Sequence, residues 1–256
     1  MSALPILEGV DNFRDYGGYP TAHGRRLKRG RLLRSASHGR ASDADLEAIA
    51  SLGIAVVVDL RRRSERERDP SRRHPSFAAV LIENDEEGPD TWHAHIAGSD
   101  LSPASFRDFA MDYYRSAPFE TRHIDLFRRY FEALERFEGP ILIHCAAGKD
   151  RTGILAALTH HIAGVHPDDI VADYLLTNDA ARIAKRAPLV AATIREATGR
   201  TPADEALRVA LGVEAAYLET AFAQITARHG GLDAYLNDAL GLSPERCGAL
   251  AARLLE

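Results

Sequence analysis

The segment of residues 139–162 constrains the fold of this chain more than any other. Residues 141–143 form a short apolar run that is typical of a buried strand, and apolar side chains recur at helical spacing over residues 154–162. Only a tight loop lies between them, with Gly148 and Gly153 where the backbone must turn sharply. A strand that passes through a short loop directly into a helix is a unit of an α/β sheet, so this segment predicts that class of fold.

The same loop holds a cysteine and an arginine at a spacing that suits anion chemistry. Five residues separate Cys145 from Arg151. A loop that ends at a helix N-terminus points backbone N–H groups at an anion, and the helix dipole adds partial positive charge there. That field favours the thiolate form of a cysteine, the form that acts as a nucleophile. The planar fork of an arginine can bind two phosphate oxygens at once. We therefore expect a phosphate-binding loop that carries its own nucleophile.

Three other interpretations of the loop have to be weighed. A nucleotide-binding P-loop needs a glycine at the position of Ile143 and a serine or threonine at the position of Asp150, and this chain has neither. A rhodanese-like sulfur carrier also places a cysteine in an anion-binding loop, but it does not require the Arg-Thr-Gly that follows here. A phosphate-binding module that has lost turnover would keep the loop as well. The combination of residues favours an active phosphatase.

The loop resembles the signature of cysteine-dependent protein tyrosine phosphatases. His144-Cys145-Ala-Ala-Gly-Lys-Asp-Arg151-Thr-Gly is similar to the bacterial members whose loops read His-Cys-x-Ala-Gly-Lys-Asp-Arg-Thr-Gly. Further similar segments span nearly the whole chain and include Asn12-Phe-Arg-Asp15, Val171-Ala-Asp-Tyr174 and Gly212-Val-Glu-Ala-Ala-Tyr217. The resemblance implies a phosphatase that hydrolyses phosphotyrosine, with phosphoserine, phosphothreonine and phosphoinositides as further substrates, through a phosphocysteine intermediate and with no metal or cofactor.

The resemblance and the chemistry together assign roles within and around the loop. Cys145 is the expected nucleophile and Arg151 the residue that clamps the transition state. We expect the general acid among Asp150, Asp85 and Glu86, with Asp150 favoured because it lies beside the loop. The expected substrate-binding residues are Ala146, Ala147, Gly148, Lys149 and Thr152, with the Thr152 hydroxyl donating to the Cys145 sulfur. The expected supporting residues are His144, Asp59 and Arg14.

Other segments place the loop within a mostly parallel sheet flanked by helices. Residues 42–53 read as a capped helix and residues 54–60 as a fully buried strand, which puts Asp59 and the Cys145 loop at the same edge of the sheet. Residues 78–82 predict another strand, and the acidic loop after it contains Asp85. The arginine-rich stretch of residues 61–73 is expected to be a solvated surface loop.

Everything beyond Gly164 is expected to be helical, and an amphipathic helix is expected just before the catalytic strand, over residues 121–137. We expect one phosphatase domain over residues 1–256. Residues 180–211, interrupted by Pro188, Gly199 and Pro202, are a candidate helical lid. Residues 212–256 are expected to form a helical extension that packs on the domain.

Composition limits the partners and the location. A net charge of −5 argues against a general nucleic-acid binder, and no apolar run reaches the length of a membrane span. The N-terminal residues lack the features of a signal peptide, and Cys145 and Cys247 are the only cysteines, so a structural disulfide is not expected. We expect a cytoplasmic phosphatase acting on a phosphoprotein or a phosphoinositide. Export without a signal peptide and the oligomeric state stay open.

Overall fold

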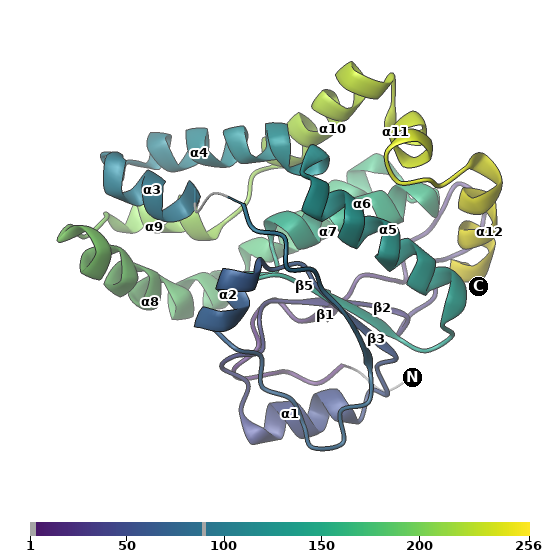
Figure 1. Ribbon diagram of the computed structural model, residues 1–256, viewed down its shortest axis with the longest axis horizontal. Helices are drawn as coiled ribbons and strands as arrows, with labels where there is room; N and C mark the ends of the chain where they lie inside the picture. Colours follow the sequence, from purple (N-terminus) through teal and green to yellow (C-terminus); the bar gives the residue numbers. More distant parts are fainter. Residues whose placement is uncertain (1–3, 89–90) are drawn as a thin grey trace.

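A five-stranded sheet forms the centre of the molecule (Figure 1). The computed structural model describes residues 4–88 and 91–256. Within them the strand order is β1-β2-β5-β3-β4. The strands are β1 (Arg14–Asp15), β2 (Leu32–Ser35), β3 (Val56–Asp59), β4 (Val80–Ile82) and β5 (Ile141–His144). β1 pairs antiparallel to β2 and every other pairing is parallel, so the predicted mostly parallel α/β sheet is confirmed.

The two faces of the sheet bury different side chains. Val56 and Val58 of β3 belong to the main apolar cluster, whereas Val57 joins a smaller cluster on the opposite face. Side chains alternate between the two faces of a strand, so the continuous apolar runs of β3 and β5 mark strands that are covered on both sides. The central position of β3 and β5 follows from that pattern.

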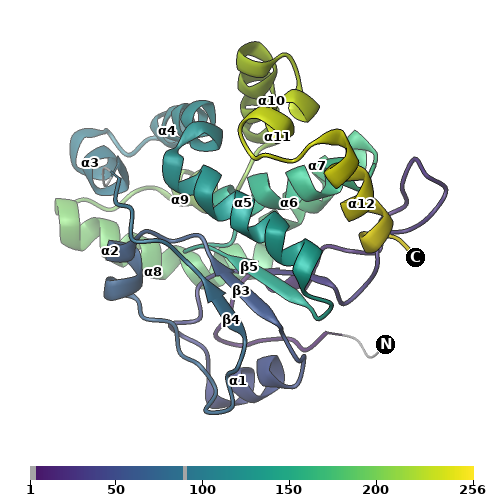
Figure 2. The same cartoon turned by 45° about the vertical axis from the view of Figure 1, so that its right-hand side comes forward.

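Most helices lie on one side of the sheet, and α1 (Asp43–Ala50) lies on the other (Figures 1 and 2). The predicted capped helix is confirmed at α1. The Ser42 hydroxyl accepts a hydrogen bond from Asp45 N at 3.1 Å, and the Asp45 carboxylate accepts one from Ser42 N at 2.9 Å. This reciprocal capping box satisfies two backbone donors at the helix N-terminus.

The helical side holds the main core. The apolar face of α5 (Thr121–Arg136) is fully buried there through Leu126, Phe127, Phe131 and Leu134. Burying one such side chain stabilises the fold by about 1.5–3 kcal/mol. The other helices that contribute to this cluster are α4 (Pro103–Ser116), η1 (Ala117–Phe119), α6 (Asp150–Ile162), α7 (Pro167–Leu175), α10 (Ala215–His229), α11 (Leu232–Asp238) and α12 (Pro244–Leu254).

A second apolar cluster lies at one end of the helical layer. Ile96 of α3 (Thr91–Gly98) and Phe106 of α4 meet Ile194 of α8 (Ala180–Thr198) and Leu207 of α9 (Asp204–Leu211). The short η2 (Leu176–Asn178) precedes α8. The helix α3 was not predicted. Nor does Pro188 interrupt the chain as expected, because α8 runs through it and ends only at Gly199, which adopts φ +70°.

The stretch of residues 61–73 lies mostly at the surface as predicted, but it is not a loop throughout and Arg61 is buried. Residues 63–68 form the helix α2 (Arg63–Arg68), and the Arg61 side chain is 1% exposed. Arg61 donates hydrogen bonds to the Asp59 carboxylate, to Asp69 O and to the Ser71 hydroxyl. The charges of this stretch therefore serve internal ion pairs rather than solvation alone. No helix in the described ranges combines the length and apolar character that crossing a membrane requires.

Candidate active site

The carboxyl ends of three parallel strands meet where the cysteine lies. Asp59 of β3 and Ser35 of β2 both pair with His144 at the end of β5. Cys145 follows His144 directly and is 2% exposed. The predicted common edge for Asp59 and the Cys145 loop is confirmed. In sheets of this kind ligands bind at this edge.

The loop turns back at Gly148, a position where only glycine fits without strain. Gly148 adopts φ +67°, and a Cβ atom there would lie 2.4 Å from Ser35 O. The Gly148 carbonyl accepts hydrogen bonds from Asn12 Nδ2 at 2.7 Å and Arg34 Nη2 at 3.1 Å. Within the described chain, no backbone N–H of residues 146–151 donates a hydrogen bond. The loop thus presents a set of unused donors at the N-terminus of α6, as an anion cradle requires.

A buried ion network holds the back of the loop. Arg14 donates to Asp173 O at 2.9 Å, and Arg34 Nη1 binds the Asp173 carboxylate at 2.8 Å. Burial alone would raise the pKa of Asp173, but the charges of Arg34 and Arg14 lower it. Arg14 therefore reaches the loop through two neighbours: Arg34, which shares Asp173 with it, and Asn12, whose side-chain oxygen accepts a hydrogen bond from Arg14 Nη1. Asn12, which the sequence indicated only as part of a similar segment, makes the direct contact.

His144 is fully buried beneath the nucleophile. Its Nε2 lies 3.5 Å from the Asp59 carboxylate, and its ring stacks on His38 with 5.0 Å between centroids. Burial lowers the pKa of His144 to about 4, with the Asp59 charge opposing. Burial would raise the pKa of Asp59, but the charge of His144 and hydrogen bonds from Arg61 lower it to about 2. At neutral pH the pair is therefore a neutral imidazole beside a carboxylate.

Arg151 is held by a partner that sequence reasoning missed. Its Nη1 and Nη2 donate to the two carboxylate oxygens of Glu65 at 2.6 and 2.7 Å, and Nη1 also donates to Leu60 O at 3.1 Å. Burial would raise the pKa of Glu65, but the Arg151 charge and hydrogen bond lower it strongly. Arg151 Nε–H makes no hydrogen bond with the described residues.

Glu65 also caps its own helix. Its Oε2 accepts a hydrogen bond from Arg62 N at 2.8 Å at the start of α2. In the sequence, Glu65 lies three positions after Arg62, which is the spacing of a glutamate that caps a helix N-terminus. Because several other charged residues surround Glu65 in the sequence, this spacing did not stand out.

The candidate general acids occupy different environments. Asp150 is the first residue of α6, its side chain is 25% exposed, and it accepts a hydrogen bond from the Tyr114 hydroxyl at 3.0 Å. The Asp85 side chain is 73% exposed and pairs with Arg66 at 2.6 Å. Glu86 is exposed. Of the three, only Asp150 adjoins the loop.

Lys149 points to the helical layer rather than to the cradle. Its Nζ donates to Ala210 O at 2.8 Å and Gly212 O at 3.2 Å, at the end of α9. The half-buried Ala146 and Ala147 form the loop's first turn, where Ala146 O accepts from Ser37 N at 3.1 Å. The lysine therefore joins the loop to the segment that the sequence marks as a candidate lid.

Two hydroxyls near the loop are buried without a partner. Thr152 Oγ1 has none in the described structure, so the expected hydrogen bond to the Cys145 sulfur is not formed in this state. Tyr113 Oη is also unpaired, and burial strongly raises the pKa of this tyrosine, within reach of the charges of Arg151 and Cys145. Buried polar atoms normally find a partner, so these two hydroxyls are exceptions among the buried groups beside the loop.

A cysteine at a strand end, a cradle of unused backbone donors and an arginine fixed above it together define a cysteine-dependent phosphatase. Comparison with known proteins agrees with this class. The model of the tyrosine phosphatase family matches residues 5–256, and the chain belongs to that family.

Three bacterial phosphatases are similar to this chain over different shares of its length. The "Triple specificity protein phosphatase PtpB" of Mycobacterium tuberculosis is 30% identical over 99% of both chains. A Cupriavidus necator protein, whose name gives it as an inferred tyrosine-protein phosphatase, is 33% identical over 91% of this chain and 83% of its own. A tyrosine-protein phosphatase of Nostoc commune is 32% identical over 57% of this chain and 48% of its own. The chain is a protein tyrosine phosphatase, and neither a sulfur carrier nor a module without turnover is favoured.

Proposed function

We propose that Cys145 attacks the phosphorus of a phosphomonoester in line with the leaving oxygen and forms a phosphocysteine, which water then hydrolyses. The P–O bond to the leaving group breaks as the S–P bond forms. The backbone N–H groups of residues 146–151 bind the equatorial oxygens together with Arg151. Thr152 donates its hydroxyl to the sulfur when the thiolate becomes the leaving group.

The observation that carries the proposal is the placement of Arg151. Glu65 and Leu60 fix the guanidinium, and the Nε–H of Arg151 stays available. A cation whose orientation is set before the substrate arrives stabilises transition-state charge without reorganisation, which is a large part of catalysis in sites of this kind.

Asp150 is our proposed general acid, which protonates the leaving oxygen. Its place at the start of α6 beside the cradle supports this role, whereas Asp85 points to solvent in an ion pair with Arg66. Tyr114 donates to one Asp150 oxygen at 3.0 Å, and Lys149 Nζ lies 3.8 Å from the other, which is the oxygen we propose for the substrate.

The substrates are of the phosphoprotein type, as the family implies. We propose phosphotyrosine as the main substrate, with phosphoserine, phosphothreonine and phosphoinositides as further ones, because the relative from M. tuberculosis is named for triple specificity. Lys149 would bind the extra phosphates of a lipid headgroup. Since its Nζ is bound to Ala210 O and Gly212 O, this role requires the end of α9 to move away.

The proposal extends to the organisation of the chain. We propose a single phosphatase domain in which residues 180–211 form a movable cover and residues 212–256 pack as its helical extension. A cytoplasmic location belongs to the same proposal, since both cysteines are free and the nucleophile requires a reducing environment.

Trapping the phosphoenzyme tests the mechanism. Wild-type protein should release phosphate from p-nitrophenyl phosphate and give a phosphocysteine on rapid acid quench. Cys145→Ser should still bind tungstate yet release no phosphate, whereas Cys247→Ser, the matched control, should keep wild-type activity. Substantial turnover by Cys145→Ser would refute the nucleophile. A panel of phosphotyrosine, phosphoserine and phosphothreonine peptides and phosphoinositides then tests the substrate range.

A further inference from the structure

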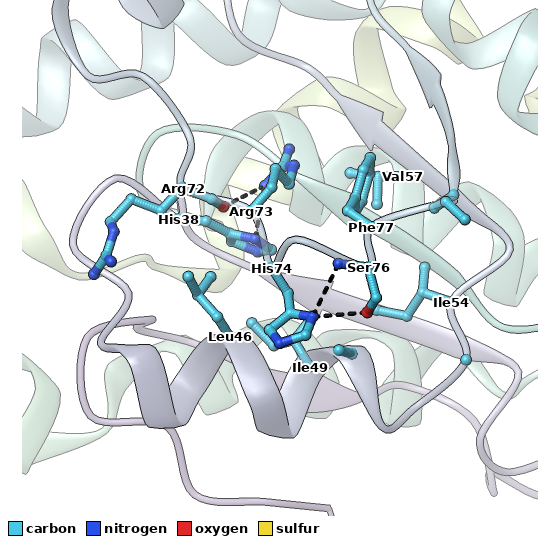
Figure 3. A pocket seen from close by; sticks show the side chains of 14 residues that line it. His38, Leu46, Ile49, Ile54, Val57, Arg72, Arg73, His74, Ser76 and Phe77 are labelled. Carbon is cyan, nitrogen blue, oxygen red and sulfur yellow. Dashed lines mark hydrogen bonds between the residues drawn. The ribbon is translucent and has the colours of Figure 1, made fainter.

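A cavity of about 300 Å³ lies on the α1 side of the sheet, and no residue of the phosphate loop lines it (Figure 3). Its walls come from α1, from β3 through Val57 and from the segment of residues 72–79. On this face the sheet is covered by α1 and extended chain instead of a full helical layer. The volume is at the lower end of the range in which proteins bind small molecules, roughly 300–1,000 Å³.

The cavity has one apolar side and one basic side. Leu46 and Ile49 of α1 and Val57 of β3 supply apolar surface. The polar lining side chains come from His38, Arg72, Arg73, His74 and Ser76, and no lining residue is acidic. A ligand that matches both sides carries an anionic head on an apolar body.

Arg73 is the lining cation that forms no ion pair with a carboxylate in the described residues. Arg72 pairs with Asp43 at 2.6 Å, and His74 lies 2.9 Å from Glu47. Arg73 has no carboxylate partner among the described residues. Its Nη1 lies 3.0 Å from His38 Nδ1 and 3.3 Å from Arg72 O, and its guanidinium lies 5.1 Å from the Phe77 ring centroid. Figure 3 shows Arg73 and His38 together at one end of the cavity.

We propose that this cavity binds a small amphipathic carboxylate whose head pairs with Arg73 and whose apolar body packs on Leu46, Ile49 and Val57. A guanidinium fork fits a carboxylate with two parallel hydrogen bonds. A single guanidinium that is not already in an ion pair suits a monoanion better than a phosphate dianion. Of the other basic lining residues, Arg72 already pairs with Asp43 and His74 lies beside Glu47.

The site is connected to the catalytic loop through two stacked rings. Besides its contact with Arg73, the His38 ring binds the Ser35 hydroxyl through Nε2 at 3.1 Å and stacks on His144. His144 precedes the nucleophile. A bound carboxylate that draws Arg73 away from His38 would therefore change the contacts of His38 with Ser35 and His144, although it does not enter the phosphate loop. This consequence, which rests on the proposed function, is a change in kcat with little change in KM.

Binding is tested on the full chain with 4-phenylbutyrate as the probe and 4-phenylbutanol as its uncharged counterpart. Backbone amide NMR shifts should move at Ile49, Ala50 and Ala79, and saturating tungstate in the catalytic loop should not displace the probe. Arg73→Gln should weaken binding about tenfold or more, Arg73→Lys less, and Arg136→Gln, an exposed arginine elsewhere, not at all. Ala50→Phe, which fills the cavity, should abolish binding.

Each contrary result overturns a stated part of the proposal. Displacement of the probe by tungstate would place it in the catalytic loop, and equal affinity for the alcohol would exclude recognition by Arg73. Binding by a folded Ala50→Phe protein would exclude the cavity, and this variant decides the matter if Arg73→Gln does not fold. A bound probe that leaves kcat unchanged would refute the connection through His38 while leaving the binding site intact. Because these binding measurements need no turnover, failure of the proposed mechanism would not affect them.

Discussion

The carboxylate of Glu65 receives both Nη groups of Arg151, at 2.6 and 2.7 Å, across 86 residues of sequence. The contact joins the helix that follows β3 to the helix that follows β5. It exists because those two strands are neighbours in the sheet and release their next elements at the same edge. One glutamate thereby caps α2 and orients the cation of the phosphate cradle.

Removing this carboxylate should slow catalysis while leaving the nucleophile intact. Glu65→Ala should lower kcat/KM about tenfold to a hundredfold, because Arg151 then samples orientations that do not match the transition state. Arg151→Lys sets the upper limit, with an expected loss of about 3 kcal/mol or roughly a hundredfold. The measurement is steady-state hydrolysis of p-nitrophenyl phosphate together with tungstate affinity.

Glu67 provides the matched control for Glu65. It lies on the same helix and makes an exposed pair with Arg63, with a side chain that is 62% exposed. Exposed pairs of this kind contribute about 0–1 kcal/mol, so Glu67→Ala should leave kcat/KM near the wild-type value. If both variants lose activity equally, loss of α2 rather than loss of the Arg151 contact would explain the result.

Asp150 and Asp85 can be separated by the leaving group. Asp150→Asn should slow substrates with poor leaving groups most, and it should flatten the basic limb of the pH–rate profile, because no proton donor remains for the leaving oxygen. Asp85→Asn should change neither, since that carboxylate is solvated and paired with Arg66. The measurement is kcat/KM for a series of aryl phosphates between pH 5 and 8. The opposite pattern would transfer the acid role to the loop after β4.

The buried pair beneath Cys145 should make stability fall in acid. Burial lowers the pKa of His144 to about 4, so the unfolded state takes up a proton first, and this contribution is lost as pH falls from about 6.5 through 4. Asp59, with its pKa lowered to about 2, loses its contribution only below about pH 3.9. Between pH 7 and 4, the His144→Gln variant should therefore lose less unfolding free energy than the wild type, by on the order of 2–3 kcal/mol.

Urea unfolding at a series of pH values measures this slope. The His144→Gln variant is expected to be less stable at every pH, so only the slope is diagnostic. His166, whose side chain is 68% exposed, supplies the control, and His166→Gln should keep the wild-type slope. An unchanged slope in His144→Gln would assign the acid sensitivity to the other buried histidines.

Sequence patterns predicted the elements whose stabilising interactions are local or repetitive. The apolar runs of β3 and β5, the capping box of α1 and the amphipathic face of α5 all appear within a short window of sequence. Cys145, Gly148 and Arg151 could be singled out because one turn of chain brings them together. Their combination and spacing within one short loop were enough to predict a phosphate-binding site with its own nucleophile.

The features that were missed depend on contacts between distant segments. The helix α2 has no apolar periodicity, since its six residues are arginines, glutamates and one serine. Its place is set by partners that include Arg151 and Glu87. The Lys149 ammonium was expected to bind substrate. In the structure it donates to the carbonyls of Ala210 and Gly212, which lie more than sixty residues further along the chain. No local pattern indicates such pairings.

The segment of α8 and α9 should behave as a cover that opens over the site. Its apolar contacts, centred on Ile194, Ala206 and Leu207, belong to the second cluster and not to the main core. The turn between the two helices passes through Gly199, and Lys149 ties the end of α9 to the catalytic loop. Elements that pack outside the main core can open without unfolding that core.

Amide hydrogen exchange measures this opening directly. We expect α8 and α9 to exchange faster than α5 and to slow when tungstate occupies the loop. Lys149→Met should speed exchange in α9 and leave α5 unchanged, because it removes the hydrogen bonds to Ala210 O and Gly212 O. Lys28→Met is the matched control, since Lys28 donates to Arg253 O at 2.8 Å, a carbonyl at the end of α12. Exchange in α8 and α9 as slow as in α5, with no response to tungstate or to Lys149→Met, would make the two helices fixed scaffold.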